Sequence, residues 1–289
     1  MLEINGFDKT LGNKLVLKDI SLHIEQGSIT GLIGINGAGK TTLLRCIAGV
    51  YKGDSGICQY NGQDIYENEL IKKDILFLSD DLYYENDATI ASLIEFYEIF
   101  YDCFDKEKFQ EYMDVLKLNQ NELIRKFSKG MKKQAFICLQ LALCPKVLLL
   151  DESFDGLDPV MKSIIKKAIT DLVMDYQSIV FISSHSLSDI EKIADHYVVL
   201  DNQTIVSHDD VEESLESYHR IQMAFASPVC EDLFIDLNVV ECSINGQIVT
   251  LVVQGNLEEI ERKIETYQPL MSKVLDLSLE EIFVSKMAK

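Results

Sequence analysis

One short stretch near the N-terminus constrains the fold more than any other part of the sequence. Residues 34–41 read GINGAGKT and match the pattern G-x-x-x-x-G-K-[ST], whose glycines let successive backbone N–H groups turn toward a phosphate. The stretch lies between an apolar strand pattern at Ser28–Ile33 and a helical pattern at Lys40–Ala48. The N-terminus of a helix adds partial positive charge. We therefore expect a phosphate-binding loop, because a glycine-rich turn that binds nothing would explain neither Lys40 nor Thr41.

The side chains of this loop have the chemistry to hold a nucleoside triphosphate and its metal. Lys40 is long enough to reach the β- and γ-phosphates, and the Thr41 hydroxyl is a suitable Mg²⁺ ligand. We expect ATP as the ligand. The loop residues expected to contact it are Asn36, Gly37, Ala38, Gly39, Lys40, Thr41 and Thr42.

Two acidic residues follow a second buried strand pattern. Asp151 and Glu152 come directly after Val147–Leu150, where an ionised carboxylate is costly unless it has a partner. Mg²⁺, bound directly or through water, is the expected partner of Asp151. We expect Glu152 to orient the water that attacks the γ-phosphate. The alternative is an acidic strand end that is merely solvated.

A histidine follows the next strand along the chain. His185 comes after Ile179–Ser183, and ligands of open α/β sheets bind beyond the carboxyl ends of the strands. We therefore expect the phosphate loop, the two acids and His185 to converge on one site, where His185 reaches the γ-phosphate. An isolated histidine without a role is the alternative.

Alternation of strands and helices predicts an α/β core with additions at both ends. Residues 1–24 have the pattern of two strands around a turn, and Thr89–Leu118 has helical periodicity typical of an inserted helical segment. After residue 218 the texture changes to an α+β pattern with a hairpin turn at Asn245-Gly246 and a capping box from Ser278 to Glu281. The expected domains are residues 1–218, with a helical subdomain at about 86–145, and residues 219–289.

Composition restricts the partners and the compartment. The net charge of -20 argues against binding nucleic acid and against direct contact with an anionic membrane surface. No apolar run reaches the roughly 18 residues of a membrane span, and no signal peptide is visible. Seven cysteines without a Cys-x-x-Cys pair are typical of reduced thiols. We expect a cytoplasmic chain that acts at a membrane only through another protein.

The order of these motifs resembles the ATP-binding subunits of ABC transporters over residues 1–218. Phe127–Met131 stands in the place of the family's Leu-Ser-Gly-Gly-Gln signature loop, Asp155–Asp158 resembles its D-loop, and His185 its switch histidine. The resemblance implies a P-loop NTPase cassette with a RecA-like core, an N-terminal antiparallel β subdomain and a helical subdomain. It also implies an ATPase that forms a homodimer or heterodimer head to tail.

In such a dimer each ATP lies between the phosphate loop of one chain and the signature loop of the other. By this resemblance Ser128, Gly130 and Asp158 are expected to contact a nucleotide held by the partner. A separate transmembrane permease subunit is the implied partner, and it places the chain at the inner face of the cell membrane. The docking groove is expected between the loop around Asp80 and the helical insertion, with Tyr83 and Tyr84 as contact residues.

The sequence departs from the family pattern at several positions. Leu11 occupies the place of the adenine-stacking aromatic residue, so a weaker apolar contact with the base is expected. Asp80 aligns with the family's Q-loop glutamine, and we assign it a catalytic and water-mediated Mg²⁺ role. Lys129 and Met131 replace the usual glycine and glutamine of the signature loop. Two interpretations stay open for the next two lysines, Lys132 and Lys133. They could give electrostatic support to a phosphate, or they could form a solvated face of the helix.

The C-terminal segment and the variant signature narrow the resemblance. The chain ends in SLEEIFVSKM before its last two residues, similar to the tails of bacterial exporter ATPases for antibiotics and peptides. The Ser-Lys-Gly-Met-Lys-Lys variant resembles a subgroup near exporters of amphipathic peptides such as the phenol-soluble modulins. Other interpretations are a soluble ABC ATPase acting on ribosomes or DNA, a regulatory chain that binds ATP without hydrolysing it, and a P-loop kinase.

Overall fold

A computed structural model describes residues 1–101 and 103–287 as two compact units, Met1–His208 and Asp209–Lys289. The division precedes residue 218, the last residue of the first domain expected from the sequence. Residues 288 and 289, which end the second expected domain, lie outside the described residues. Among the described residues, no helix combines the length and the apolar character needed to cross a membrane. The cysteines, all within this part of the chain, are free thiols.

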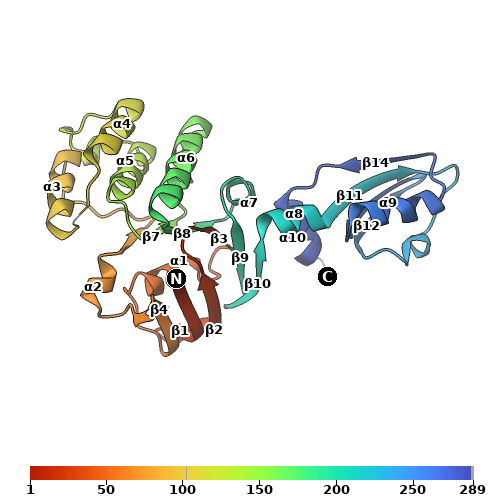
Figure 1. Ribbon diagram of the computed structural model, residues 1–289, viewed down its shortest axis with the longest axis horizontal. Helices are drawn as coiled ribbons and strands as arrows, with labels where there is room; N and C mark the ends of the chain where they lie inside the picture. The colour runs from red at the N-terminus through yellow and green to blue at the C-terminus, as the bar shows by residue number, and fades with distance from the viewer. Residues whose placement is uncertain (102, 288–289) are drawn as a thin grey trace. The chain divides into compact units, whose positions relative to one another are not determined.

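The centre of the first unit is a largely parallel sheet with the strand order β10-β9-β3-β8-β7-β6 (Figure 1). The pairs from β9 across to β6 run parallel, and β3, β7 and β8 are buried along their whole length, as continuous apolar strands of parallel sheets are. The strands are β3 (Ile29–Ile33), β6 (Ile75–Leu78), β7 (Val147–Asp151), β8 (Ile179–Ser184), β9 (His196–Asp201) and β10 (Thr204–Asp210).

A second, antiparallel sheet covers one side of this core, with the order β2-β1-β4-β5. Its inward side chains share one hydrophobic cluster with helix α1 (Lys40–Ile47) and with β3, β7 and β8, so the two sheets enclose a single core. The two predicted strands in residues 1–24 are confirmed. The strands of this sheet are β1 (Leu2–Leu11), β2 (Lys14–Ile24), β4 (Ser55–Tyr60) and β5 (Gln63–Asp64).

Helices gather at the other end of the first unit (Figure 1). The predicted helical insertion consists of α3 and α4, followed by α5, which packs on α4 and α6. Thr89, Asp105 and Ser128 cap α3, α4 and α5 by accepting hydrogen bonds from backbone N–H groups of the first turn. Besides α1, the helices of this unit are α2 (Glu69–Lys72), α3 (Ile90–Phe100), α4 (Lys106–Leu116), the 3₁₀ turn η1 (Ile124–Lys126), α5 (Lys129–Ala142), α6 (Pro159–Tyr176) and α7 (Leu187–Ile190).

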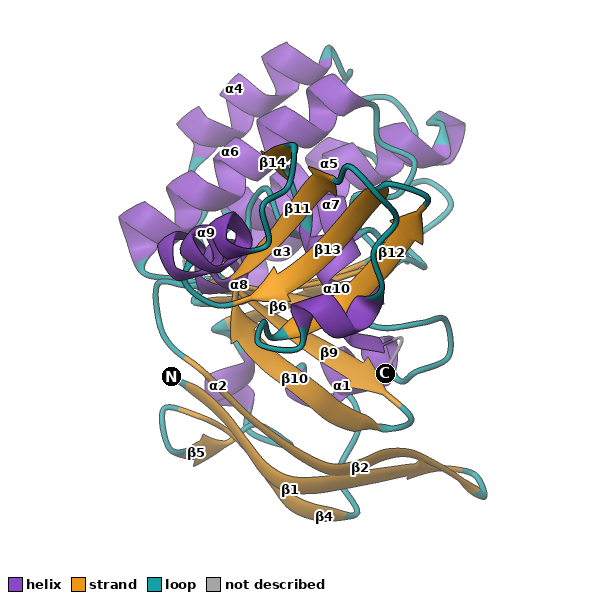
Figure 2. Ribbon diagram, turned by 90° about the vertical axis from the view of Figure 1, so that its right-hand side faces the viewer, coloured by secondary structure: helices purple, strands orange, loops and turns teal. Residues whose placement is uncertain are grey.

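The second unit is an antiparallel sheet, β12-β13-β11-β14, with helices on both faces (Figure 2). Successive side chains of β13 point to opposite faces of this sheet. Val249 and Leu251 join a core with Ile260 of α9, whereas Val252 packs with Ile282 of α10. The elements are α8 (Val211–Ser217), β11 (Tyr218–Ala224), η2 (Glu231–Phe234), β12 (Val239–Asn245), β13 (Ile248–Gln254), α9 (Leu257–Thr266), β14 (Met271–Leu275) and α10 (Leu279–Met287).

Candidate active site

The glycine-rich loop forms the predicted turn between β3 and α1. Gly39 is the residue before the helix and has φ +115°, and a Cβ on Gly34 would lie 2.4 Å from the carbonyl oxygen of Leu200, so both positions require glycine. Lys40 is 5% exposed, and its Nζ donates to the carbonyl oxygen of Gly34 at 2.7 Å. The loop therefore holds its lysine inside the cradle where a phosphate group would bind.

Asp151 at the end of β7 contacts the phosphate loop directly. The Thr41 hydroxyl donates to Asp151 Oδ2 at 2.8 Å, and the Ser183 hydroxyl donates to Asp151 Oδ1 at 2.6 Å. Asp151 is buried, so these two hydroxyls partner both oxygens of a carboxylate that water does not reach. A hydroxyl and a carboxylate held side by side are hard oxygen ligands of the kind that Mg²⁺ requires, and this donor set fits the ion.

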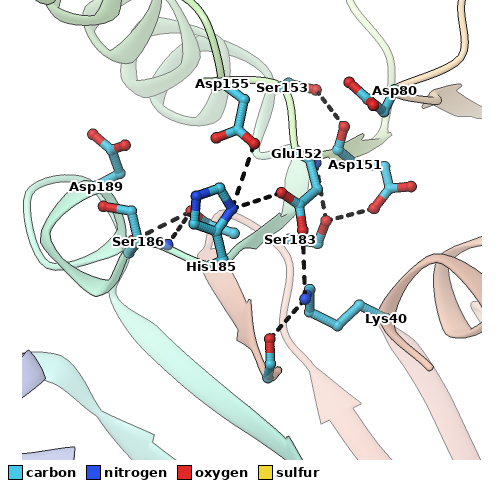
Figure 3. Close-up of polar contacts among 12 residues, drawn as sticks. Lys40, Asp80, Asp151, Glu152, Ser153, Asp155, Ser183, His185, Ser186 and Asp189 are labelled. Atoms are coloured by element: carbon cyan, nitrogen blue, oxygen red, sulfur yellow. Dashed lines mark hydrogen bonds and ion pairs between the residues drawn. The ribbon is translucent and has the colours of Figure 1, made fainter. Parts of the chain in front are cut away.

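Glu152 lies between Lys40 and His185 (Figure 3). Its Oε1 is 3.4 Å from Lys40 Nζ, and its Oε2 is 2.8 Å from His185 Nδ1. His185 Nδ1 is also 3.4 Å from Asp155 Oδ2. The parallel strands β7 and β8 end at the same edge of the sheet, which brings these side chains together as the sequence predicted.

The contacts of Glu152 shift the pKa values in this cluster. Burial raises the pKa of Glu152, but the hydrogen bonds with His185 and Asp155 and the charge of Lys40 outweigh it and hold that pKa below its usual value. The hydrogen bond to Glu152 raises the pKa of His185. Burial and the contact with Glu152 raise the pKa of Asp155. Glu152 is therefore ionised at neutral pH and faces outward with His185, whose side chain is 55% exposed.

The signature segment opens helix α5. Ser128 Oγ accepts from the Met131 N–H at 3.2 Å, which is the hydrogen bond of an N-cap. A Cβ on Gly130 would lie 3.3 Å from the carbonyl oxygen of Gly156, so the signature and D-loop segments of the same chain are in close approach. Asp158 caps α6 by accepting from the backbone N–H groups of its first turn.

Asp80 and Lys133 form an ion pair that the sequence analysis does not foresee. Asp80 Oδ1 is 2.6 Å from Lys133 Nζ and 3.7 Å from Lys129 Nζ. The pairing with Lys133 lowers the pKa of Asp80. Lys133 is 1% exposed, so its interpretation as a solvated face is wrong. Its ammonium also donates to the carbonyl oxygen of Glu152 at 2.8 Å, which occupies it with protein groups instead of a phosphate.

Three other residues near the site are Leu11, Lys132 and Ser183. Leu11 lies at the end of β1 and is 38% exposed, in keeping with a surface that a base could cover. Lys132 lies over the ring of Tyr84, with its Nζ 5.2 Å from the ring centroid. Ser183, which the motif analysis misses, donates to Asp151, and its place two residues before His185 in the sequence FISSH was the available signal.

An apolar groove lies beside Asp80. It has a volume of about 570 Å³ and is lined by the loop after β6, by α3 and by α5. Tyr83 is 82% exposed at this groove, whereas the Tyr84 ring packs 6.2 Å from that of Phe136. Gln140 is buried in its lining, and its Oε1 has no hydrogen-bond partner among the described residues.

The sequence model of the ABC transporter family matches residues 17–155 of this chain. The ATP-binding protein YtrB of Bacillus subtilis (strain 168) is 31% identical over 287 residues, which cover 99% of this chain and 98% of that protein. The chain belongs to the ABC transporter ATP-binding proteins. It is an ATPase of that family, with the P-loop NTPase fold that its motifs predicted.

Other ABC proteins extend the comparison. The bacitracin transport ATP-binding protein BcrA of Bacillus licheniformis is 28% identical, over 98% of this chain and 96% of that protein. The methionine import ATP-binding protein MetN of Clostridioides difficile (strain 630) is 30% identical, over 74% of this chain and 70% of that protein. A solved dimeric ATP-binding cassette in a post-hydrolysis state with ADP and Pi has a TM-score of 0.65 at 19% identity. That match covers 73% of this chain and 99% of that cassette.

Proposed function

We propose that this ABC ATPase binds ATP between two cassettes arranged head to tail and drives a separate transmembrane permease. The observation that carries the proposal is the position of Glu152. Its carboxylate contacts Lys40 of the phosphate loop at 3.4 Å and His185 at 2.8 Å, beside Asp151 and Thr41. These are the groups needed to hold a triphosphate, a metal and an attacking water in one place.

Glu152 acts as the base that orients and deprotonates the attacking water. Its lowered pKa keeps it ionised, so it is ready to accept a hydrogen bond from water. His185 holds one oxygen of this carboxylate and contacts the γ-phosphate. Lys40 releases Glu152 and turns to the phosphates when ATP enters, because a triphosphate carries more negative charge than one carboxylate.

Thr41 and Asp151 would hold Mg²⁺, which would neutralise charge at the phosphates. Asp80 stays a proposed water-mediated ligand of the ion. The fit of the site rests on the Thr41–Asp151 contact of 2.8 Å beside the loop that would hold the phosphates.

The second half of each site comes from the partner chain. Ser128 and Gly130 open a helix whose N-terminal charge suits the γ-phosphate of a nucleotide held by the other chain. Leu11 contacts the base of the nucleotide that its own chain's phosphate loop holds. Asp158 lies in the D-loop at the same interface. The proposed domains are a cassette of residues 1–218, with a helical subdomain at about 86–145, and an accessory domain of residues 219–289.

The permease docks in the apolar groove beside Asp80, where the exposed Tyr83 ring and the unpartnered oxygen of Gln140 await an apolar side chain and a hydrogen-bond donor. This association places the chain at the inner face of the membrane. We also propose that the transporter exports a peptide or a drug-like amphipathic compound and that this ATPase is related to those of the amphipathic-peptide exporters. Support comes from BcrA, a bacitracin transport protein whose similarity spans nearly the whole chain, accessory unit included.

Glu152→Gln tests the catalytic assignment. The amide cannot accept the proton, so turnover is expected to fall by about a thousandfold or more while ATP still binds and a dimer accumulates. ATPase assays and size-exclusion chromatography with ATP, with and without the co-purified permease, measure both effects. Glu241→Gln in the second unit is the matched control and should leave turnover unchanged. Retained ATPase activity in Glu152→Gln would remove Glu152 as the base.

A further inference from the structure

Lys133 is a buried charged residue that the catalytic assignment leaves without a role. A lysine is almost never fully buried unless it is paired. Its Nζ lies 2.6 Å from Asp80 Oδ1 in an ion pair and 2.8 Å from the carbonyl oxygen of Glu152. One ammonium on α5 therefore joins the loop after β6 to the loop that carries the catalytic carboxylate.

The backbone of Glu152 gives this contact its importance. Glu152 has φ +49°, a left-handed conformation that is unfavourable for a residue with a side chain. Such a conformation persists only where neighbouring groups hold it. The Ser183 oxygens accept from the Glu152 N–H on one side, and Lys133 donates to the Glu152 carbonyl on the other. The direction of the Glu152 carboxylate depends on this held turn.

The loop that contains Asp80 is also attached to α5 next to Lys133. Tyr84 from that loop packs against Phe136 of α5, and Lys132 of α5 lies over the Tyr84 ring. Lys129 of the same helix is 3.7 Å from Asp80 and is exposed, so it offers the carboxylate a second partner. The groove lining, α5 and the catalytic turn are thus connected by consecutive contacts.

We propose that Lys133 is a positioning residue that fixes the Glu152 backbone and transmits the position of the Asp80 loop to the catalytic carboxylate. Asp80 Oδ1 lies 2.6 Å from Lys133 and 3.7 Å from Lys129, so a shift of Asp80 toward Lys129 would weaken its hold on the buried ammonium that supports the Glu152 carbonyl. The role rests on the proposed function of Glu152 as base and of the groove as the permease site. In this chain the Asp80–Lys133 pair takes the place of a glutamine at the loop.

A double-mutant cycle on the full chain tests this inference. Lys133→Met keeps the length of the side chain but removes the charge, and the misplaced carboxylate is expected to lower kcat by about tenfold to a hundredfold. The KM for ATP should stay unchanged, because the contacts of the phosphate loop are intact. Combining Lys133→Met with Asp80→Asn should cost little more than Lys133→Met alone, because the pair is already broken and the asparagine carbonyl oxygen can still accept a hydrogen bond from a metal-bound water. Lys167→Met, an exposed lysine of α6, is the matched control and should keep kcat and KM.

The outcomes separate this inference from the catalytic assignment. Additive effects of the two substitutions, or a KM that rises in step with the loss of kcat, would overturn the role of Lys133 while leaving Glu152 as the base. Retained turnover in Glu152→Gln would overturn the base assignment, and the coupling of Asp80 to Lys133 stays measurable. If Lys133→Met does not fold, the variants Asp80→Glu and Asp80→Asn are compared instead. Asp80→Glu keeps a carboxylate that can pair with Lys133 and should retain most of the wild-type kcat, whereas Asp80→Asn should lower it. Equal kcat values in the two variants would contradict the inference.

Discussion

At the scale of single residues, the site is organised around the charge of Glu152. The carboxylate has Lys40 on one oxygen and His185 on the other, so it is never a lone charge at the end of a buried strand. In the proposed mechanism, the phosphates of ATP draw Lys40 away from Glu152, so the ionised base becomes available when substrate binds.

The His185–Glu152 pair predicts a pH-dependent contribution to stability. The hydrogen bond to Glu152 raises the pKa of His185 above 6.5, so this contribution is complete below pH 6.5 and is lost as pH rises through the raised pKa. Despite the opposing effect of burial, the hydrogen bonds with His185 and Asp155 and the charge of Lys40 hold the pKa of Glu152 below 4.5. The contribution of Glu152 is complete above pH 4.5 and is lost as pH falls through the lowered pKa.

His185→Gln removes this pair. The difference in Tm from the wild type should be largest between pH 4.5 and 6.5 and should shrink at higher pH. It should be small throughout, because the His185 side chain is half exposed. Thermal melts of both proteins across this range measure it. A difference that does not vary with pH would contradict the pairing.

At the scale of elements, helix α5 contributes to two functions at once. Its N-terminus presents Ser128 and Gly130, and its first turns hold Lys133 against Asp80 and Glu152. In the proposed head-to-tail dimer, a shift of α5 as a rigid element would change both the surface offered to the partner's nucleotide and the support of the chain's own catalytic turn.

Ser128→Arg tests the cross-chain role of this helix. The bulky cation is expected to prevent closure on the partner's γ-phosphate and to lower ATPase activity by about a hundredfold, while the isolated monomer binds ATP as before. Nucleotide binding by the monomer and steady-state turnover are the two measurements. Ser128→Ala is the control, with a loss of about 1 kcal/mol in unfolding free energy from the missing cap. Loss of ATP binding by the monomeric Ser128→Arg chain would place Ser128 in its own chain's site.

Elements with strong local patterns were predictable from the sequence. The phosphate loop, the strands β7 and β8 and the capping box at Ser278 appear as expected, because their residues specify structure locally. The sequence analysis assigns no strands to β9 and β10, although β9 pairs with β3 at the centre of the sheet. The Asp80–Lys133 pair also escaped it, because the two residues meet only after distant segments pack together.

At the scale of the whole molecule, the proposed head-to-tail dimer has two composite sites, and each chain supplies half of each site. Lys40 belongs to the phosphate half and Ser128 to the signature half, and in the head-to-tail arrangement each half meets its complement on the other chain. The second unit has hydrophobic clusters of its own on both faces of its sheet, so its fold does not depend on the nucleotide. Under this proposal catalysis requires the dimer, while a single chain is sufficient to bind the nucleotide.

Mixing two inactive variants tests this central claim most directly. Chains with Lys40→Ala lack a working phosphate half, and chains with Ser128→Arg lack a working signature half. In a head-to-tail mixed dimer, one site joins the intact phosphate loop of one chain to the intact signature loop of the other. Single-turnover hydrolysis should therefore rise well above that of either variant alone when the two are mixed. Mixed protein that stays as inactive as its separate components would contradict the composite site.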